Sequence, residues 1–350
     1  MHHRLLSALQ SLTEVRLVAS LKDDRLGFPD RKDLRVFVPD IHLISEARQR
    51  EGGFRFGTNH EALLTDVFGT LKELKTRAAS SETVAVYLLG DFLDLWRETP
   101  RLNERLDAAA AIRDDHEDLV ATVLDPALRT RFLLGNHDFD LYRWSDYVGW
   151  DRRYFLPDRT LQSPSAILMH GDVFDWVEKL PDPLQQVMVY LFAPHLSPNS
   201  HDLGEVGRLV TRSHGTRSYR NYLRAPTPKD LGELPLLASG APVPARHNIA
   251  TPVSGAKGRL KHLTSAWKKT AEANRKYQMN LRVMFIGHKH FARIAVRETD
   301  AGEFFALVDC GAWIEKATWV QEGRRITAPS AQLAALSNNE VRLYQLGEVG

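Results

Sequence analysis

The chain has 350 residues, of which 43% are hydrophobic and 26% charged, and its formal net charge is +2. These values are typical of a soluble globular protein and exclude a disordered or fibrous chain. The single cysteine, Cys310, excludes an internal disulfide framework and a thiolate metal cluster. No apolar run reaches the roughly 18 residues of a membrane span, so we expect a cytoplasmic protein.

Residues 1–33 are expected to form an N-terminal helical extension packed on the body of the protein. The observation is a stripe of apolar residues at helical spacing, namely Leu5, Leu6, Leu9, Leu12 and Leu17 with Val18. Peripheral contact with a membrane surface is the alternative, but Arg4 and Arg16 are too few to make a strongly basic face.

Five apolar runs each lead into a polar residue that can bind a metal ion. They are residues 34–39 before Asp40, 84–90 before Asp91, 131–135 before Asn136, 166–169 before His170 and 282–287 before His288. Such runs are typical of buried strands, and helical patterns around residues 59–78 and 102–124 separate the first three. This alternation predicts an α/β fold, in which a ligand site lies outside the carboxyl ends of the strands. The five polar groups should therefore converge.

Further strands are expected at residues 292–296, 304–308 and 341–346, as an antiparallel portion that closes the fold. The core would then comprise residues 34–172 and 281–350.

The 117 residues between His170 and His288 are too many for a loop. We therefore expect residues 173–280 to form an inserted, mainly helical lid subdomain.

This insertion is basic, since residues 205–280 contain 14 Lys and Arg against four Asp and Glu, a formal charge of +10. Arg217, Arg220 and Arg224 can share one helix face and could clamp an anionic, phosphate-containing substrate. The alternative is a solvated helix face on a structural appendage. The apolar helix expected at residues 184–192 could be core or the wall of an acyl-chain pocket.

The motifs after the strands have the chemistry of metal ligands. In Asp40-Ile41-His42, residues two apart point the same way in extended backbone and can hold one cation together. In Gly90-Asp91-Phe92-Leu93-Asp94, the two oxygens of Asp91 can bridge two cations. The alternative for Asp91 and Asp94 is capping of a helix N-terminus.

The later motifs supply an amide and imidazoles. Gly135-Asn136-His137-Asp138 offers a neutral oxygen ligand followed by a histidine that can face a substrate. His170 and the pair His288 and His290 provide nitrogen ligands for two close cations. Alternatively, Gly135-Asn136 could form an ordinary turn and the histidines could be buried core residues. The presence of such residues after five strands of one chain argues against both alternatives.

In this order, Asp-x-His, Gly-Asp-x-x-Asp, Gly-Asn-His-Asp, His-Gly-Asp and Gly-His-x-His resemble the motifs of the calcineurin-like metallophosphoesterase family. The resemblance covers residues 34–172 and 281–315 and implies a β-sandwich flanked by helices. It implies one cation held by Asp40, His42, Asp91 and His290, and another held by Asp91, Asn136, His170 and His288. His137 would be the catalytic imidazole, oriented by Asp94, with Asp138 as the competing carboxylate.

Within that family the chain is most similar to UDP-2,3-diacylglucosamine hydrolases. The similarity lies in residues 90–96, in the insertion after His170 and in Gly311-Ala312-Trp313. Two features depart from their pattern: those enzymes typically carry Arg where this chain has His137, and the insertion here is longer.

The resemblance implies a two-metal hydrolase in which hydroxide held by the cations attacks phosphorus in line. The mixed nitrogen and oxygen ligands favour Mn, with Fe, Zn or Co as alternatives, over Mg or Ca. His137 would protonate the departing oxygen. The expected substrate is a nucleotide-linked lipid or a small phosphodiester.

Three alternative functions stay open. A nucleic-acid phosphodiesterase is not favoured, because Trp267 and Tyr277 are too sparse for base stacking. The second is a phosphatase acting on proteins or small phosphomonoesters. The third is a non-catalytic binding protein, which the loss of a ligand or of His137 would have supported; neither is lost.

Overall fold

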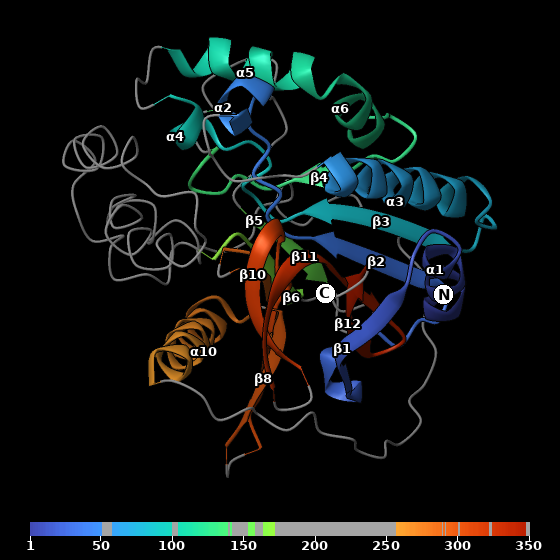
Figure 1. Ribbon diagram of the computed structural model, residues 1–350. Helices are drawn as coiled ribbons and strands as arrows, with labels where there is room; N and C mark the ends of the chain where they lie inside the picture. The colour runs from blue at the N-terminus through green and yellow to red at the C-terminus, as the bar shows by residue number, and fades with distance from the viewer. Residues whose placement is uncertain are drawn as a thin grey trace.

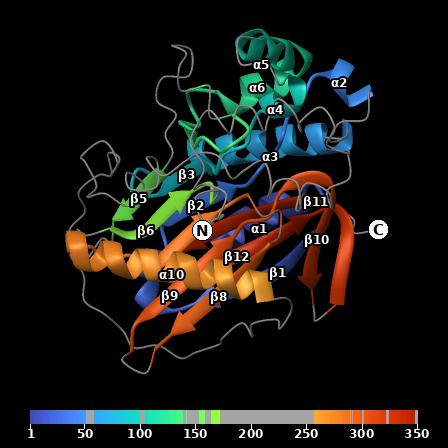
Figure 2. The same ribbon diagram turned by 90° about the vertical axis from the view of Figure 1, so that its left-hand side faces the viewer.

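In the computed structural model the chain forms two β-sheets that face each other, with helices on their outer sides (Figures 1 and 2). The structure describes residues 1–50, 58–99, 104–138, 141, 153–157, 164–171, 257–288, 290, 292–299, 302–321 and 324–347. Within these residues the fold is a mixed α/β arrangement, as predicted.

The first sheet has seven described strands. Its main path runs in the order β1 (Val15–Lys22), β12 (Glu340–Leu346), β11 (Arg324–Ser337), β2 (Asp33–Val38), β3 (Thr83–Leu88) and β4 (Arg131–Phe132), and β10 (Trp313–Gln321) pairs with β11. β2, β3 and β4 are parallel, whereas β1, β11 and β12 join by antiparallel pairing.

The second sheet has five described strands, in the order β5 (Arg153–Pro157), β6 (Pro164–Met169), β7 (Val283–Ile286), β9 (Phe304–Asp309) and β8 (Arg293–Glu298). β6, β7 and β9 are mutually parallel, and β5 and β8 lie antiparallel at the two edges. The parallel strands are central in the second sheet, whereas in the first sheet they form one side, from β2 to β4.

Side chains of β2 divide between two hydrophobic cores, because successive residues of a strand point to opposite faces. Leu34, Val36 and Val38 belong to the core between the first sheet and its helices. Phe37 belongs to the core between the two sheets, where its ring lies 4.0 Å, centroid to centroid, from that of Phe285. Burial on both faces explains why this strand is an unbroken apolar run.

Helices lie outside the two sheets, some of them against a sheet and others packed on those helices (Figures 1 and 2). They are α1 (His2–Gln10), α2 (Glu46–Arg50), α3 (Thr58–Thr76), α4 (Leu95–Glu98), α5 (Arg105–Asp115), α6 (Glu117–Val123) and α10 (Lys257–Tyr277), with a 3₁₀ turn at Asp24–Leu26. α10 packs Ala266 and Ala273 into the core of the second sheet. No helix in the described ranges combines the length and the hydropathy needed to cross a membrane.

The predicted strands before Asp40, Asp91, Asn136, His170 and His288 are confirmed as β2, β3, β4, β6 and β7. The helical patterns at 59–78 and 102–124 are confirmed as α3 and as α5 with α6, and the late strands as β8, β9 and β12. β8 and β12 are antiparallel to their neighbours as expected, whereas β9 is antiparallel to β8 and parallel to β7. β1, β5, β10 and β11 were not anticipated.

The N-terminal extension expected at residues 1–33 is helical only in its first part. α1 ends at Gln10, and Val15–Lys22 forms β1, which pairs antiparallel with β12. Leu17 therefore lies on a strand, with 51% of its surface exposed, and does not extend the helical stripe. Pairing with a strand more than 300 residues away overrides a local helical spacing.

The division between the core and the insertion stays a prediction, because most of the insertion lies outside the described residues. This applies to the helix expected at 184–192 and to Arg212, Arg217, Arg220 and Arg224. The described end of the insertion is helical, since α10 occupies residues 257–277.

Candidate metal centre

The candidate ligands follow the carboxyl ends of the parallel strands in both sheets. Asp40 and His42 follow β2, Asp91 follows β3, Asn136 follows β4, His170 follows β6, and His288 and His290 follow β7. Because parallel strands end at the same edge, this topology collects seven polar side chains from five distant segments of the chain. Apart from His288 and His290, which are partly exposed, these side chains are buried.

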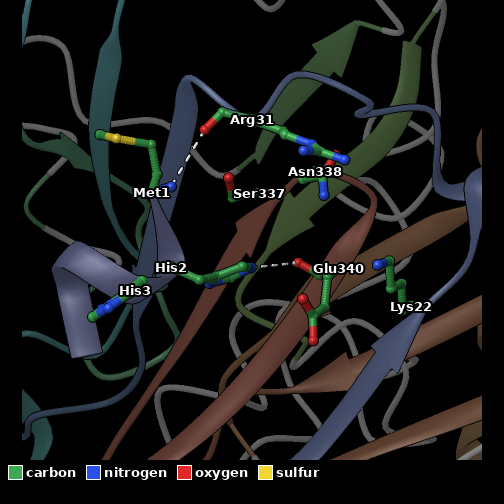
Figure 3. A pocket seen from close by; sticks show the side chains of 8 residues that line it. All are labelled: Met1, His2, His3, Lys22, Arg31, Ser337, Asn338 and Glu340. Carbon is green, nitrogen blue, oxygen red and sulfur yellow. Dashed lines mark hydrogen bonds between the residues drawn. The ribbon is translucent and has the colours of Figure 1, made fainter. Parts of the chain in front are cut away.

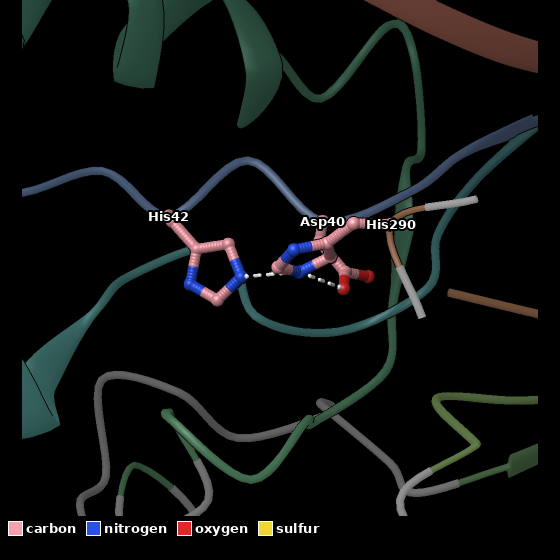
Figure 4. A group of neighbouring side chains, drawn as sticks. All are labelled: Asp40, His42 and His290. Carbon is pink, nitrogen blue, oxygen red and sulfur yellow. Dashed lines mark hydrogen bonds and ion pairs between the residues drawn. The ribbon is translucent and has the colours of Figure 1, made fainter. Parts of the chain in front are cut away.

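A first group consists of Asp40, His42 and His290 (Figure 4). The Nε2 atom of His290 lies 3.0 Å from Nε2 of His42 and 3.0 Å from Oδ2 of Asp40. Ligand atoms about 2.1 Å from one cation lie roughly 3 Å apart from one another. The spacing within this group is therefore that of ligands on a single ion.

A second group gathers around His170. Its Nε2 atom lies 3.1 Å from Oδ2 of Asp91, 3.0 Å from Oδ1 of Asn136 and 3.2 Å from Nδ1 of His288. Its other nitrogen, Nδ1, lies 3.0 Å from the carbonyl oxygen of Leu89. A carbonyl only accepts hydrogen bonds, so Nδ1 carries a proton, and when the ring is neutral Nε2 therefore presents a lone pair.

In the neutral ring, this arrangement leaves electron-rich atoms facing one another. The lone pair of His170 Nε2 meets a carboxylate oxygen and an amide oxygen, neither of which can donate a hydrogen bond. A divalent cation between these atoms relieves their repulsion, and a proton donated to a carbonyl by the second ring nitrogen is the usual setting of a metal-bound histidine. The residues present therefore fit a metal ion.

Asp91 lies between the two groups. Its Oδ2 atom is 3.1 Å from His170 and 3.8 Å from Nε2 of His42, while its Oδ1 atom accepts a hydrogen bond of 2.8 Å from the backbone N–H of His137. Asp91 is thus within reach of both groups, and its role as a bridging ligand stays a prediction.

Negative charge is concentrated in this buried region. Burial by itself would raise the pKa of the Asp40 and Asp91 carboxyls, but neighbouring imidazoles, above all His170, hold both pKa values below the usual range. Oδ1 of Asp40 is buried and accepts no hydrogen bond from any described residue. Buried carboxylates of this kind are normally paired or bound to a metal.

His137 is held by Asp94 and not by Asp138. Nδ1 of His137 lies 2.6 Å from Oδ1 of Asp94. Burial opposes protonation of the ring, but the charges of Asp94 and Asp91 outweigh it and raise the pKa of His137. Oδ2 of Asp94 also lies 3.3 Å from Nδ1 of His42, so one carboxylate contacts both histidines.

Asp138 joins the loops that follow β3 and β4. Its two oxygens accept hydrogen bonds from the backbone N–H groups of Gly135, at 2.7 Å, and Phe92, at 2.8 Å. Burial, reinforced by the charge of Asp91, raises the pKa of Asp138 to about 7. The sequence left Asp138 open as the residue that orients His137. In the structure Asp138 instead holds two loops together beside the site.

Four candidate ligands adopt left-handed backbone. Their φ angles are 57° at His42, 50° at Asp91, 67° at His288 and 49° at His290. These are half of the eight non-glycine residues with positive φ in the described part of the chain. Such conformations cost about 1–3 kcal/mol each and cluster at functional sites, so strain is concentrated at the edge where the ligands meet.

Gly135 is predicted to be essential for metal binding. A Cβ atom at this position would collide with the carboxylate of Asp91 and lie 2.6 Å from its backbone nitrogen. Gly135→Ala should therefore displace Asp91 and lower the metal content measured by elemental analysis.

Gly69→Ala is the matched control, because a Cβ at Gly69 in α3 meets nothing within 4 Å. This variant should keep the metals and raise thermal stability slightly, since alanine favours a helix by about 1 kcal/mol over glycine. Wild-type metal content in Gly135→Ala would contradict the proposed position of Asp91.

Sequence reasoning did not assign a role to Trp96 or Arg97, both in α4. The Trp96 ring lies 4.6 Å, centroid to centroid, from the His137 ring, and Nε of Arg97 lies 3.3 Å from Oδ2 of Asp94. Because they follow Asp94 closely in the chain, a place near the site could have been expected for both residues. The sequence does not show in which direction their side chains point.

A separate pocket of about 340 Å³ lies at the opposite edge of the first sheet (Figure 3). It is lined by Met1, His2, His3, Lys22, Arg31, Ser337, Asn338 and Glu340. None of the candidate ligands contributes to it.

No protein-family model matches the chain, and no curated protein matches it by sequence. One similar solved structure is described as a conserved uncharacterised protein, a predicted phosphoesterase, from Streptococcus pneumoniae. The two chains are 10% identical, the match covers 92% of this chain and 91% of the other, and the TM-score is 0.26. A TM-score this low does not establish a shared fold, so the function proposed below follows from the residues of the site.

Proposed function

We propose that the protein is a two-metal-dependent phosphohydrolase that cleaves a phosphoester or pyrophosphate bond. The observation that carries this proposal is the position of His170 Nε2, which lies 3.1 Å from an oxygen of Asp91, 3.0 Å from an oxygen of Asn136 and 3.2 Å from a nitrogen of His288. A second group of three candidate ligands lies beside it, and Asp91 stands between the two.

One cation would be held by Asp40, His42, Asp91 and His290, and the other by Asp91, Asn136, His170 and His288. When bound, two divalent cations supply a hydroxide nucleophile at neutral pH and neutralise charge on a phosphoryl group. Four imidazoles with oxygen ligands favour Mn, with Fe, Zn or Co as alternatives. This mixed donor set supports a transition metal over Mg or Ca.

The catalytic acid in this proposal is His137. Its Nδ1 atom is held by Asp94 at 2.6 Å, which leaves Nε2 to hold the proton that moves to the departing oxygen. Protonation is favoured by the carboxylates of Asp94 and Asp91, which raise the pKa of His137 against the effect of burial. Asp94 thus fixes the tautomer and stabilises the charged ring.

The substrate class we favour is a small phosphodiester or a nucleotide-linked lipid, with a phosphomonoester as the alternative. A nucleic-acid substrate is less well supported, because Trp267 on α10 is partly buried in the core and the Arg297 guanidinium lies 3.8 Å from its ring centroid. A face covered in this way is not a stacking platform for bases.

We also propose a cytoplasmic location, which the single cysteine supports.

Metal analysis tests the proposed function. Protein stripped by a chelator should be inactive and, after reloading with Mn²⁺, should hold close to two ions per chain, as two-metal sites do. Hydrolysis should return on at least one member of a panel that comprises a phosphomonoester, a phosphodiester and a nucleotide pyrophosphate. A stoichiometry at or below about one ion in saturating Mn²⁺ would contradict a two-metal centre.

A further inference from the structure

Trp96 occupies an unusual place for a buried tryptophan. It lies in the one-turn helix α4, which Asp94 caps by accepting a hydrogen bond of 3.3 Å from the backbone N–H of Arg97. Only 2% of its surface is exposed, yet it belongs to neither of the two hydrophobic cores in the described part of the chain. Its neighbour Leu95 does belong to one of them.

The ring of Trp96 lies against the imidazole of His137. The two centroids are 4.6 Å apart and the rings are inclined by 30°. The edge of His42 approaches the same imidazole, at 4.8 Å and 87°. Aromatic rings whose centroids lie at this distance attract each other.

The contact supplies a restraint that Asp94 cannot. A hydrogen bond between Asp94 Oδ1 and His137 Nδ1 restrains one ring atom, but coupled rotation about the Cα–Cβ and Cβ–Cγ bonds can still tilt the ring while that bond is kept. A flat neighbour over the imidazole face removes this rotation. The plane of the ring, and with it the direction of Nε2, is then defined by Trp96.

We propose that Trp96 is a positioning residue that sets the plane of His137 and so aims its Nε2 atom at the departing oxygen of the substrate. This role rests on the proposed function of the same site. The carboxylate and the aromatic face come from one short segment, Asp94 and Trp96, so α4 places both restraints on the imidazole together.

Two variants test the role. Trp96→Leu removes the flat face and should lower kcat for an alkyl phosphodiester about 10- to 100-fold, as small misplacements of a catalytic group do. KM and the content of two metal ions should stay unchanged. A nitrophenyl phosphodiester, whose leaving group needs no proton, should lose much less. Trp96→Phe retains an aromatic face and should restore most of the rate on the alkyl ester.

A measurement independent of activity accompanies the kinetics. In protein labelled with ¹³C-histidine, the signal of His137, assigned by its loss in His137→Gln, should be shifted upfield by the ring current of Trp96. This shift should shrink in Trp96→Phe and vanish in Trp96→Leu. An unshifted signal in the wild type would overturn the inference, even if Trp96→Leu failed to fold.

The kinetic outcomes separate this role from the proposed function. Equal losses on the two esters, or loss of metal from Trp96→Leu, would show that Trp96 only supports the packing of the site and would overturn its positioning role. Failure of the metal-loaded wild type to hydrolyse any phosphoester would overturn the proposed function, and the role of Trp96 with it.

Discussion

Asp91→Asn is expected to remove metal from both sites, whereas Asp40→Asn should mainly empty one. Asp91 is the carboxylate between the two groups, 3.1 Å from His170 and 3.8 Å from His42. Asparagine keeps the shape but loses the charge that attracts two cations. Since a catalytic metal stabilises a transition state by several kcal/mol, activity should fall on the order of 10³-fold.

The measurement is metal stoichiometry and affinity in each variant, together with turnover. Asp33→Asn is a suitable control, because Asp33 is also buried but lies at the amino end of β2 and pairs with Arg35 at 3.2 Å. This control should lose stability and keep both metals. If Asp91→Asn and Asp40→Asn bind metal as the wild type does, the ligand assignment is wrong.

His137→Ala should keep both metals and lose about 10²–10⁴ in kcat on an alkyl phosphodiester, the usual contribution of a positioned acid. The loss on a nitrophenyl ester should be smaller, because nitrophenolate leaves without a proton. Equal losses on both substrates would show that His137 positions the phosphate and does not act as the acid. Loss of a metal ion would make His137 a ligand.

Asp94→Asn should share this dependence on the leaving group, since Asp94 contacts Nδ1 of His137 at 2.6 Å. It should also weaken metal binding about 10- to 100-fold, as loss of a carboxylate behind a ligating histidine does, because Asp94 lies 3.3 Å from Nδ1 of His42. Asp138→Asn is the comparison, and its effect should not depend on the leaving group. A silent Asp94→Asn with a damaging Asp138→Asn would transfer the orienting role to Asp138.

The strands and their ligands could be predicted because both signals are local. A strand buried on both faces is an unbroken apolar run, and the residue that follows it lies at the edge of the sheet. Phe37, Leu88 and Ile286 belong to such runs, and Asp40, Asp91 and His288 follow them. The composition of each segment was enough to predict that these side chains converge.

Other features depend on contacts between distant segments. Val15–Lys22 is a strand because β12 is available to pair with it, a fact that no local pattern contains. The same holds for Arg324–Ser337, which is held between β12 and β2 and reaches beyond them to pair with β10.

The sequence by itself determined which five strands lead into the candidate ligands, the residues at the carboxyl ends of those strands and the kind of site that these residues can form. Only the tertiary structure decided which carboxylate holds His137. Asp138 is adjacent to His137 in the chain, but its oxygens are taken by the backbone of Gly135 and Phe92, while Asp94, 43 residues away, reaches the imidazole. Hydrogen-bond partners depend on which loops lie next to each other in the folded protein. The contact between Trp96 and His137 likewise depends on the packing of the segment after β3 against the loop after β4.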